Sequence, residues 1–263
     1  MPNASSSRLL PLDFWRGLRR LVGSRAFSFL FSLRERSQFR KRFEELRAAG
    51  LHEPASNHRT LVRRLELPEP TESTLHQVVQ VWKQLNVDKL DVGYEKTYAS
   101  IVDALMSNGA SALSVLEIGV HGGASLRGWR TIFRDALVIG LDIDESTMFS
   151  ERGIETFVAD QLSVQSLGLA AERFKQGFDL IVDDGWHQPQ ANINSLSAFL
   201  NRLNPGGFYV VEDVHRPEYL PFWLRVIDAL PADFTGTVRP CGSHGILAHP
   251  SLGQVSLIVF QRQ

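Results

Sequence analysis

The sequence predicts an α/β protein built on a largely parallel β-sheet that helices cover on both faces. From residue 112 onward, short apolar runs that read as strands alternate with longer segments of helical periodicity. Parallel neighbours need a crossover of about a dozen residues or more, and the segments between the runs supply that length. With 263 residues, the chain can enclose one large core and still carry an appendage.

The predicted elements follow one another regularly. Helices are expected at 75–85 and 95–106, ahead of the sheet. Strands are expected at 113–119, 136–142, 154–159, 178–183 and 207–212. Helices are expected between most of them, at 124–134, 163–175 and 190–203, and a Pro-Gly-Gly turn precedes the last strand. After a helix at 218–229, the runs 234–241 and 254–261 are expected to form an antiparallel hairpin at the sheet edge, which makes seven strands.

The first 74 residues differ from the rest and are expected to form a basic helical extension and a linker. Residues 1–50 contain eleven Lys and Arg against four Asp and Glu, a net charge of +7, and their apolar residues recur at helical spacing. Two alternatives stay open: a helix packed on the main domain or on a second copy of the chain, or a peripheral segment on a membrane surface. Residues 50–74 contain three prolines among polar residues and are typical of a linker. The predicted domains are therefore 1–74 and 75–263.

Composition limits where the chain works and what it binds. The net charge of -1 argues neither for nor against nucleic acid, and no such partner is expected. The single cysteine, Cys241, excludes an internal disulfide framework and suits a reducing compartment. No apolar run approaches the roughly 18–20 residues that span a bilayer, and no signal peptide is recognisable. A cytoplasmic protein is expected.

A glycine-rich turn in residues 116–123 (LEIGVHGG) joins the first predicted strand to the next helix. Phosphate, NAD and S-adenosylmethionine sites all use such a turn, because glycine admits a ligand close to the backbone and the helix offers free N–H groups. Glu117 would repel a pyrophosphate and attract an amino group such as that of methionine. Asp142, which ends the second strand, can accept both ribose hydroxyls, and Asp160 with Gln161 stands at the height of an adenine edge. The set favours S-adenosylmethionine.

Two acidic motifs follow the fourth and fifth predicted strands, at 183–187 (DDGWH) and 212–215 (EDVH). Open α/β sheets bind ligands at the carboxyl ends of their strands, and neighbouring strands lie about 4.8 Å apart. If these two strands pair, four carboxylates and two imidazoles converge on one small volume. Such crowding indicates a divalent cation, or repulsion that cationic neighbours relieve.

Together these motifs resemble a known family. The pattern Glu-x-Gly-x-x-x-Gly, the acids at 142 and 160, Asp-Asp-Gly-x-His and Pro-Gly-Gly-(x)4-Glu-Asp is similar to that of the class I S-adenosylmethionine-dependent methyltransferases. More narrowly, it resembles the metal-dependent sugar O-methyltransferases of macrolide biosynthesis, of the macrocin and mycinamicin VI type, and the related cephalosporin hydroxylase or rhamnosyl O-methyltransferase group. The resemblance covers about residues 86–263 and includes Asp88, Lys89 and Tyr94 ahead of the first strand. It implies a doubly wound, Rossmann-like sheet.

The resemblance also implies an activity: a divalent-metal-dependent O-methyltransferase that moves a methyl group from S-adenosylmethionine to a hydroxyl of a sugar or glycoside. Asp184, Glu212 and Asp213 are then the metal ligands, and all-oxygen ligation favours Mg²⁺, with Mn²⁺ or Ca²⁺ as alternatives. His187 is the implied general base, a role that suits an imidazole near neutral pH. His215 is either a structural residue or a substrate contact. The expected cofactor-binding residues are Glu117, Gly119, Gly122, Gly123, Ser125, Asp142, Asp160, Gln161 and Asp183.

Three other classes of function are weighed against this one. A non-haem iron oxygenase could use His187, His215 and one carboxylate, but the sequence has no His-x-Asp pair and its scaffold carries a cofactor turn. An NAD-dependent oxidoreductase or epimerase is disfavoured by Glu117 and by acids where a catalytic Tyr/Lys pair would be needed. A binding protein without catalysis would keep the fold alone. The acceptor stays open among a macrolide sugar, a polysaccharide, a glycolipid rhamnose and a non-sugar diol, and so does a homo-oligomeric state.

Overall fold

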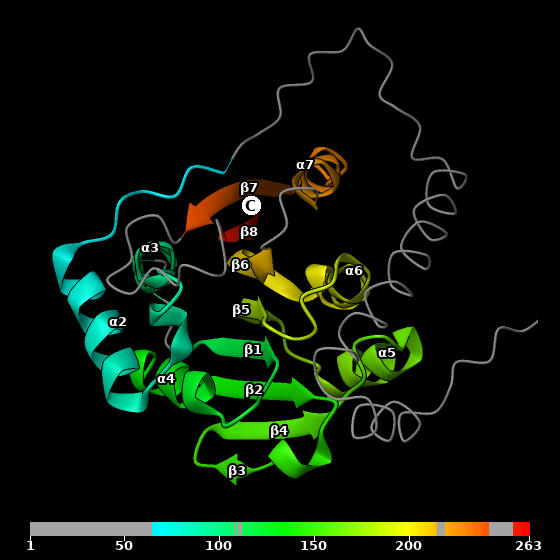
Figure 1. The fold of residues 1–263 in the computed structure, drawn as a ribbon, viewed down its shortest axis with the longest axis horizontal. Coiled ribbons are helices and arrows are strands. Elements are labelled where there is room, and N and C mark those ends of the chain that lie inside the picture. Colours follow the sequence, from blue (N-terminus) through cyan, green and yellow to red (C-terminus); the bar gives the residue numbers. More distant parts are fainter. Residues whose placement is uncertain (1–64, 108, 110–111, 215–218, 242–254) are drawn as a thin grey trace, which may run out of the picture. The chain divides into compact units, whose positions relative to one another are not determined.

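The fold is an α/β sandwich around one sheet, as the sequence predicts. The computed structural model of the chain describes residues 65–107, 109, 112–214, 219–241 and 255–263. Within these residues, eight strands form one sheet in the order β3-β4-β2-β1-β5-β6-β8-β7 (Figure 1). The strands are β1 (Ser114–Ile118), β2 (Leu137–Asp142), β3 (Ser150–Glu151), β4 (Ile154–Val158), β5 (Phe178–Asp183), β6 (Leu203–Val214), β7 (Phe234–Cys241) and β8 (Val255–Arg262).

The order of the strands fixes where a ligand site can form. β1, β2, β4, β5 and β6 pair in parallel, whereas β8 pairs antiparallel with both β6 and β7. From β1 the chain first builds outward through β2 and β4, and it then returns to place β5 on the other side of β1. The order therefore reverses between β1 and β5, and the carboxyl ends of these two strands border the crevice where such sheets bind ligands.

Two features of the sheet differ from the expectation. An eighth strand, β3, pairs antiparallel with β4 at the edge, and it is too short and too exposed to leave an apolar pattern in the sequence. β6 begins at Leu203 instead of residue 207, and it includes the Pro-Gly-Gly segment. The turn is present as an irregularity of the strand: Phe178 pairs with Leu203 but Leu180 pairs with Phe208, so residues 204–207 loop out of register.

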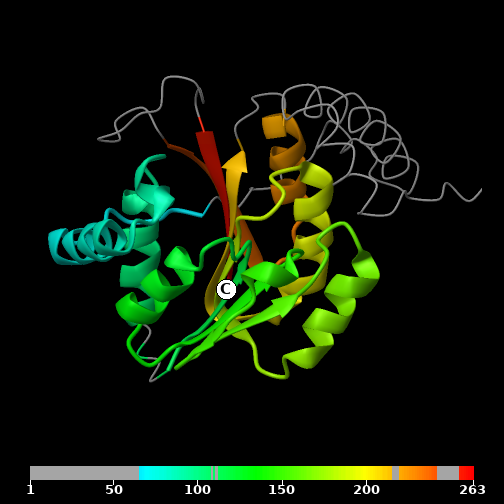
Figure 2. The ribbon, with the colours of Figure 1, turned by 60° about the horizontal axis from the view of Figure 1, so that its bottom comes forward.

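Helices cover both faces of the sheet, which is seen nearly edge-on in Figure 2. One layer holds α2 (Glu72–Leu85), α3 (Glu95–Ser107) and α4 (Ala124–Ile132), and the other holds α5 (Val164–Arg173), α6 (Pro189–Phe199) and α7 (Leu220–Asp228). Strand side chains alternate between the two layers, as a period of two requires: Val115 packs in the α2–α4 core and Leu116 in the α5–α7 core. The α2–α4 layer is centred on Trp82, Tyr98 and Trp129, whose rings lie 5.0 to 5.7 Å apart.

The packed unit begins before the boundary expected at residue 74. Residue 74 lies inside α2, and the Leu65 N–H already donates to Gly236 O of β7 at 3.2 Å. Leu65 is also buried, so the segment ahead of α2 belongs to the domain. The basic extension 1–50 lies outside the described residues. Among the residues that are described, no helix is both long and apolar enough to cross a membrane.

Candidate active site

The glycine turn lies at the carboxyl end of β1, against the strand that follows in space. Gly119 has a φ of 103°, and a Cβ on it would collide with the backbone carbonyl of Asp184. Gly123, with a φ of 72°, caps α4 without a side-chain hydrogen bond, so that the first N–H groups of the helix lack that partner. A Cβ at Gly122 would meet no atom within 4 Å. The turn is thus tightly packed against Asp184 at Gly119 and has open space beside Gly122, which fits a ligand that approaches the backbone closely.

Asp142 ties the glycine turn to the end of β2. One carboxylate oxygen accepts from the N–H of Val120 at 2.8 Å and of His121 at 3.2 Å, and the other accepts from Asp144 N–H at 2.9 Å. The side chain is only half-buried. Each carboxylate oxygen has two lone pairs, and the second oxygen uses only one of them, so Asp142 keeps acceptor capacity for a ribose hydroxyl while it holds the turn.

Glu117 is more enclosed than its expected role as an acceptor for an amino group suggests. It is fully buried, and its oxygens accept from Ser125 Oγ at 2.6 Å and from Trp129 Nε1 at 2.5 Å. Lys89 Nζ lies 3.3 Å from the same carboxylate. Burial raises the pKa of Glu117, and the charge of Lys89 opposes that rise. The carboxylate therefore braces the start of α4, and its contact with a cofactor stays a prediction.

Asp183 does not join the acidic cluster, which corrects the expectation that four carboxylates converge. It is fully buried on the α5–α7 side, where it accepts from Gln161 Nε2 at 2.6 Å and from Tyr209 OH at 3.2 Å. Burial raises its pKa to about 6, against the hydrogen bonds that it accepts. The physical reason is strand alternation, since Asp183 and Asp184 are consecutive and point to opposite faces.

Gln161 supports the loop after β5 instead of standing open to a ligand. Its side-chain oxygen accepts from Trp186 N–H at 2.8 Å, while its amide donates to Asp183 and to Ser195 Oγ. Asp160 accepts from Leu162 N–H at 2.8 Å in a local turn. Roles of Asp160 and Gln161 at an adenine edge stay predictions. Trp186 is 43% exposed at the rim of the same loop.

A bulge at the end of β6 turns two consecutive carboxylates toward the same side. The register of β6 against β8 shifts between Val211 and Val214, and Asp213 has a φ of 54°, in the left-handed region that Asp tolerates. Regular alternation would send Glu212 and Asp213 to opposite faces. Instead, Glu212 accepts from Tyr98 OH and Asp213 accepts from Tyr94 OH at 2.6 Å, and both tyrosines belong to the α2–α4 side.

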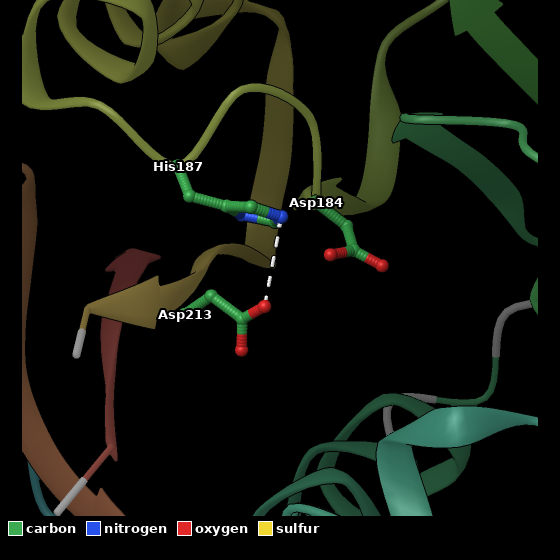
Figure 3. Close-up of side chains that lie close together, drawn as sticks. All are labelled: Asp184, His187 and Asp213. Carbon is green, nitrogen blue, oxygen red and sulfur yellow. Dashed lines mark ion pairs between the residues drawn. The ribbon is translucent and has the colours of Figure 1, made fainter. Parts of the chain in front are cut away.

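Asp184, His187 and Asp213 form a group that could hold a metal ion (Figure 3). One ligand atom from each lies within 4.8 Å of the others, and His187 Nε2 is 3.6 Å from Asp213 Oδ2. The backbone of His187 is left-handed, with a φ of 51°, and its imidazole points toward Asp184 and Asp213. Two carboxylates and an imidazole are donors that divalent ions accept, so the residues fit a cation. This set contains two of the three expected ligands, with His187 in place of Glu212.

Glu212 instead belongs to a buried network around Lys89, which the sequence did not predict. Lys89 is 1% exposed, and its Nζ donates to Asp184 Oδ2 at 2.6 Å and to Glu212 Oε2 at 2.7 Å. Burial by itself lowers the pKa of Lys89, but the charges of Asp184, Glu117 and Glu212 outweigh it and hold the pKa well above its usual value. Burial and the charge of Asp184 raise the pKa of Glu212, and Lys89 opposes them. His215 lies outside the described residues.

Comparisons with known proteins find similarity to methyltransferases. A family model described as a methyltransferase domain matches residues 116–214. The 8-demethyl-8-alpha-L-rhamnosyl tetracenomycin-C 2'-O-methyltransferase of Streptomyces olivaceus is 38% identical over 142 residues, which are 51% of this chain and 35% of that protein. Demethylmacrocin O-methyltransferase of Streptomyces fradiae is 38% identical over 107 residues, and mycinamicin VI 2''-O-methyltransferase of Micromonospora griseorubida is 37% identical over 107; each match covers 38% of this chain and 27% of the relative.

A solved structure extends the likeness to the fold. MycE methyltransferase from the mycinamycin biosynthetic pathway, in complex with Mg, SAH and mycinamycin VI, is 25% identical with a TM-score of 0.52, and the match covers 71% of this chain and 54% of that one. The chain thus matches about a third of the length of its curated relatives and about half of this structure. Residues 116–214 of the chain therefore match a methyltransferase domain, and over its matched parts the chain is similar to the macrocin and mycinamicin sugar O-methyltransferases.

Proposed function

We propose that the protein transfers a methyl group from S-adenosylmethionine to a hydroxyl of a glycoside, with the help of a divalent cation. One observation carries the proposal: the glycine turn is in direct backbone contact with Asp184, a member of the group that could hold a cation. Asp184 N–H donates to Ile118 O at 2.9 Å, and the Asp184 carbonyl lies against Gly119. A methyl donor on the turn and an acceptor on the carboxylates would therefore meet at the carboxyl ends of β1 and β5, the switch point of the sheet.

The residues of the turn would hold the methyl donor. Asp142 would accept a hydrogen bond from a ribose hydroxyl, and the first N–H groups of α4, which no side chain at Gly123 caps, would donate to polar groups of the ligand. The open space above Gly122 leaves room for the close approach of a ligand. When bound, S-adenosylmethionine supplies an activated methyl group, and the bond between that methyl carbon and the sulfonium sulfur breaks as the acceptor oxygen takes the methyl.

The acidic group would hold and activate the acceptor. Asp184 and Asp213 would bind a divalent cation, which when bound lowers the pKa of a neighbouring hydroxyl. His187 would take the hydroxyl proton on its imidazole nitrogen, and Asp213, 3.6 Å away, would stabilise the imidazolium that results. Family resemblance makes Glu212 the third ligand and His187 the base, whereas the geometry also allows His187 to be a ligand. Mn²⁺ affinity after His187→Ala separates the two roles, because loss of a base leaves that affinity unchanged.

The curated relatives act, by their names, on rhamnosyl tetracenomycin C, demethylmacrocin and mycinamicin VI. We therefore infer a glycoside acceptor for this chain too, and its identity needs an experiment. The full chain would be incubated with methyl-labelled S-adenosylmethionine, Mg²⁺ and a panel of rhamnosides, other deoxyhexosides and non-sugar diols. The methylated oxygen would then be located by NMR. Label in a sugar hydroxyl supports the proposal. Label only in non-sugar diols, with Asp213→Asn as the inactive control, would contradict the acceptor class.

A further inference from the structure

Lys89 is a buried ammonium group at the centre of the acidic cluster. It stands in η1 (Asp88–Leu90), the short turn ahead of α3, and only 1% of it is exposed. Its Nζ lies 2.6 Å from Asp184, 2.7 Å from Glu212 and 3.3 Å from Glu117. A lysine is seldom buried so completely without partners, because leaving water is costly for the charge. Three carboxylates supply the compensation here.

The same ammonium group contacts carboxylates that the proposed function gives to a divalent cation. Asp184 belongs to the cation-binding group of the structure, and Glu212 belongs to the ligand set that the family implies. Two cations near one carboxylate repel each other, and the ammonium group and the metal ion share the negative charge of the same oxygens. Asp213 differs, since its carboxylate accepts from the neutral hydroxyl of Tyr94.

We propose that Lys89 is a positioning residue that holds the carboxylates of Asp184 and Glu212 in place and, as a built-in cation, weakens the affinity of the site for a divalent ion. The inference rests on the proposed metal-dependent function. In the metal-free site, the charge of Lys89 balances the negative charge of the buried carboxylates. The site also binds the metal less tightly than the same carboxylates would alone, so that an acceptor that chelates the ion contributes to holding it.

The test is Mn²⁺ binding to the full chain, measured from the EPR signal of free Mn²⁺ without cofactor or acceptor. Lys89→Met removes the charge, Lys89→Arg keeps it, and Arg127→Met removes a partly exposed cation that pairs with Glu151. Because a unit charge close to a divalent ion is weakly screened in a buried site, Lys89→Met should bind Mn²⁺ about tenfold more tightly or better. Lys89→Arg and Arg127→Met should stay within about threefold of the unchanged protein, which confines the effect to the buried charge.

The outcomes separate the inference from the function on which it rests. Unchanged or weaker Mn²⁺ binding by a folded Lys89→Met variant overturns the role of Lys89 but leaves a metal enzyme. Failure of both the unchanged chain and a folded Lys89→Met variant to bind Mn²⁺ overturns the proposed metal dependence itself. If Lys89→Met does not fold, carbon-13 NMR of labelled lysine in the unchanged protein decides, since the chain has only five lysines. Mg²⁺ should shift the signal that Lys89→Arg removes, and an unmoved signal would overturn the inference.

Discussion

Replacing Gly119 by alanine should destabilise the domain, because this glycine lies where the glycine turn touches the backbone of Asp184, directly after β5. Its φ of 103° is a backbone conformation that residues with a Cβ rarely adopt. The added Cβ would also overlap the backbone carbonyl of Asp184, which no side-chain rotation can relieve. Strain of this kind costs on the order of 1–3 kcal/mol, and overpacking a tight contact costs about the same again.

The expected loss for Gly119→Ala is therefore roughly 2–6 kcal/mol in the free energy of unfolding. For a domain of this size, that corresponds to a fall of roughly 5–20 °C in the midpoint of thermal unfolding. Relief of the overlap would push Asp184 away from His187 and Asp213, so Mn²⁺ affinity should fall as well.

Gly122→Ala is the matched control, because the same methyl group there would meet no atom within 4 Å. Its unfolding free energy should stay within about 0.5 kcal/mol of the unchanged protein. Its affinity for S-adenosylmethionine should nevertheless fall if the open space above the turn admits the cofactor. Urea denaturation gives both free energies, and calorimetry gives the affinity. Equal stability of Gly119→Ala and Gly122→Ala would refute the claim that the turn and the strand are packed against each other through Gly119.

Four further changes address the cofactor site, the metal site and the extension. Asp142→Ala removes a charged acceptor, worth on the order of 1.5–3 kcal/mol, so calorimetry should show S-adenosylmethionine binding roughly 10- to 150-fold more weakly; unchanged binding would remove Asp142 from the site. Asp213→Asn should abolish turnover or raise the Mg²⁺ concentration that turnover requires, while the affinity for S-adenosylmethionine stays nearly intact. His187→Ala should lower turnover roughly 100- to 10,000-fold, and a loss below about threefold would show that His187 is structural. A chain that starts at Leu61 should bind S-adenosylmethionine as tightly as the full chain does. If residues 1–50 bind membranes, the full chain should float with anionic vesicles, and added salt should weaken that binding; no salt-sensitive flotation would exclude the membrane role.

Much of the fold follows from local pattern. Apolar runs identify the central strands, and helical periodicity identifies the helices between them, because both patterns record which face of an element is buried. The edge strand β3 leaves no such record, since its two residues are exposed. The extent of β6 could not be predicted either, because residues 204–207 loop out of register inside it and look like an ordinary turn in sequence.

The site could be predicted only in part from the sequence, and there are physical reasons why the remaining features could not be predicted. The two acidic strand ends do lie side by side, because β5 and β6 pair in parallel. The separation of Asp183 from Asp184 follows from alternation and was available in the sequence. The bulge that turns Asp213 with Glu212 was not, since it depends on pairing with β8 and on a left-handed backbone. Lys89 reaches Glu212 across 123 residues of sequence, a contact that only the packed fold creates.

The central claim is that methyl transfer needs a divalent metal ion at the carboxyl ends of β5 and β6. The measurement is single-turnover transfer of labelled methyl from S-adenosylmethionine to an accepted glycoside, with the full chain in EDTA and again after Mg²⁺ is restored. Cofactor binding is measured in the same two solutions. We expect cofactor binding to be the same in both solutions, because Asp142 and the glycine turn need no metal, and we expect label to be transferred only with Mg²⁺. Full transfer in EDTA would contradict it.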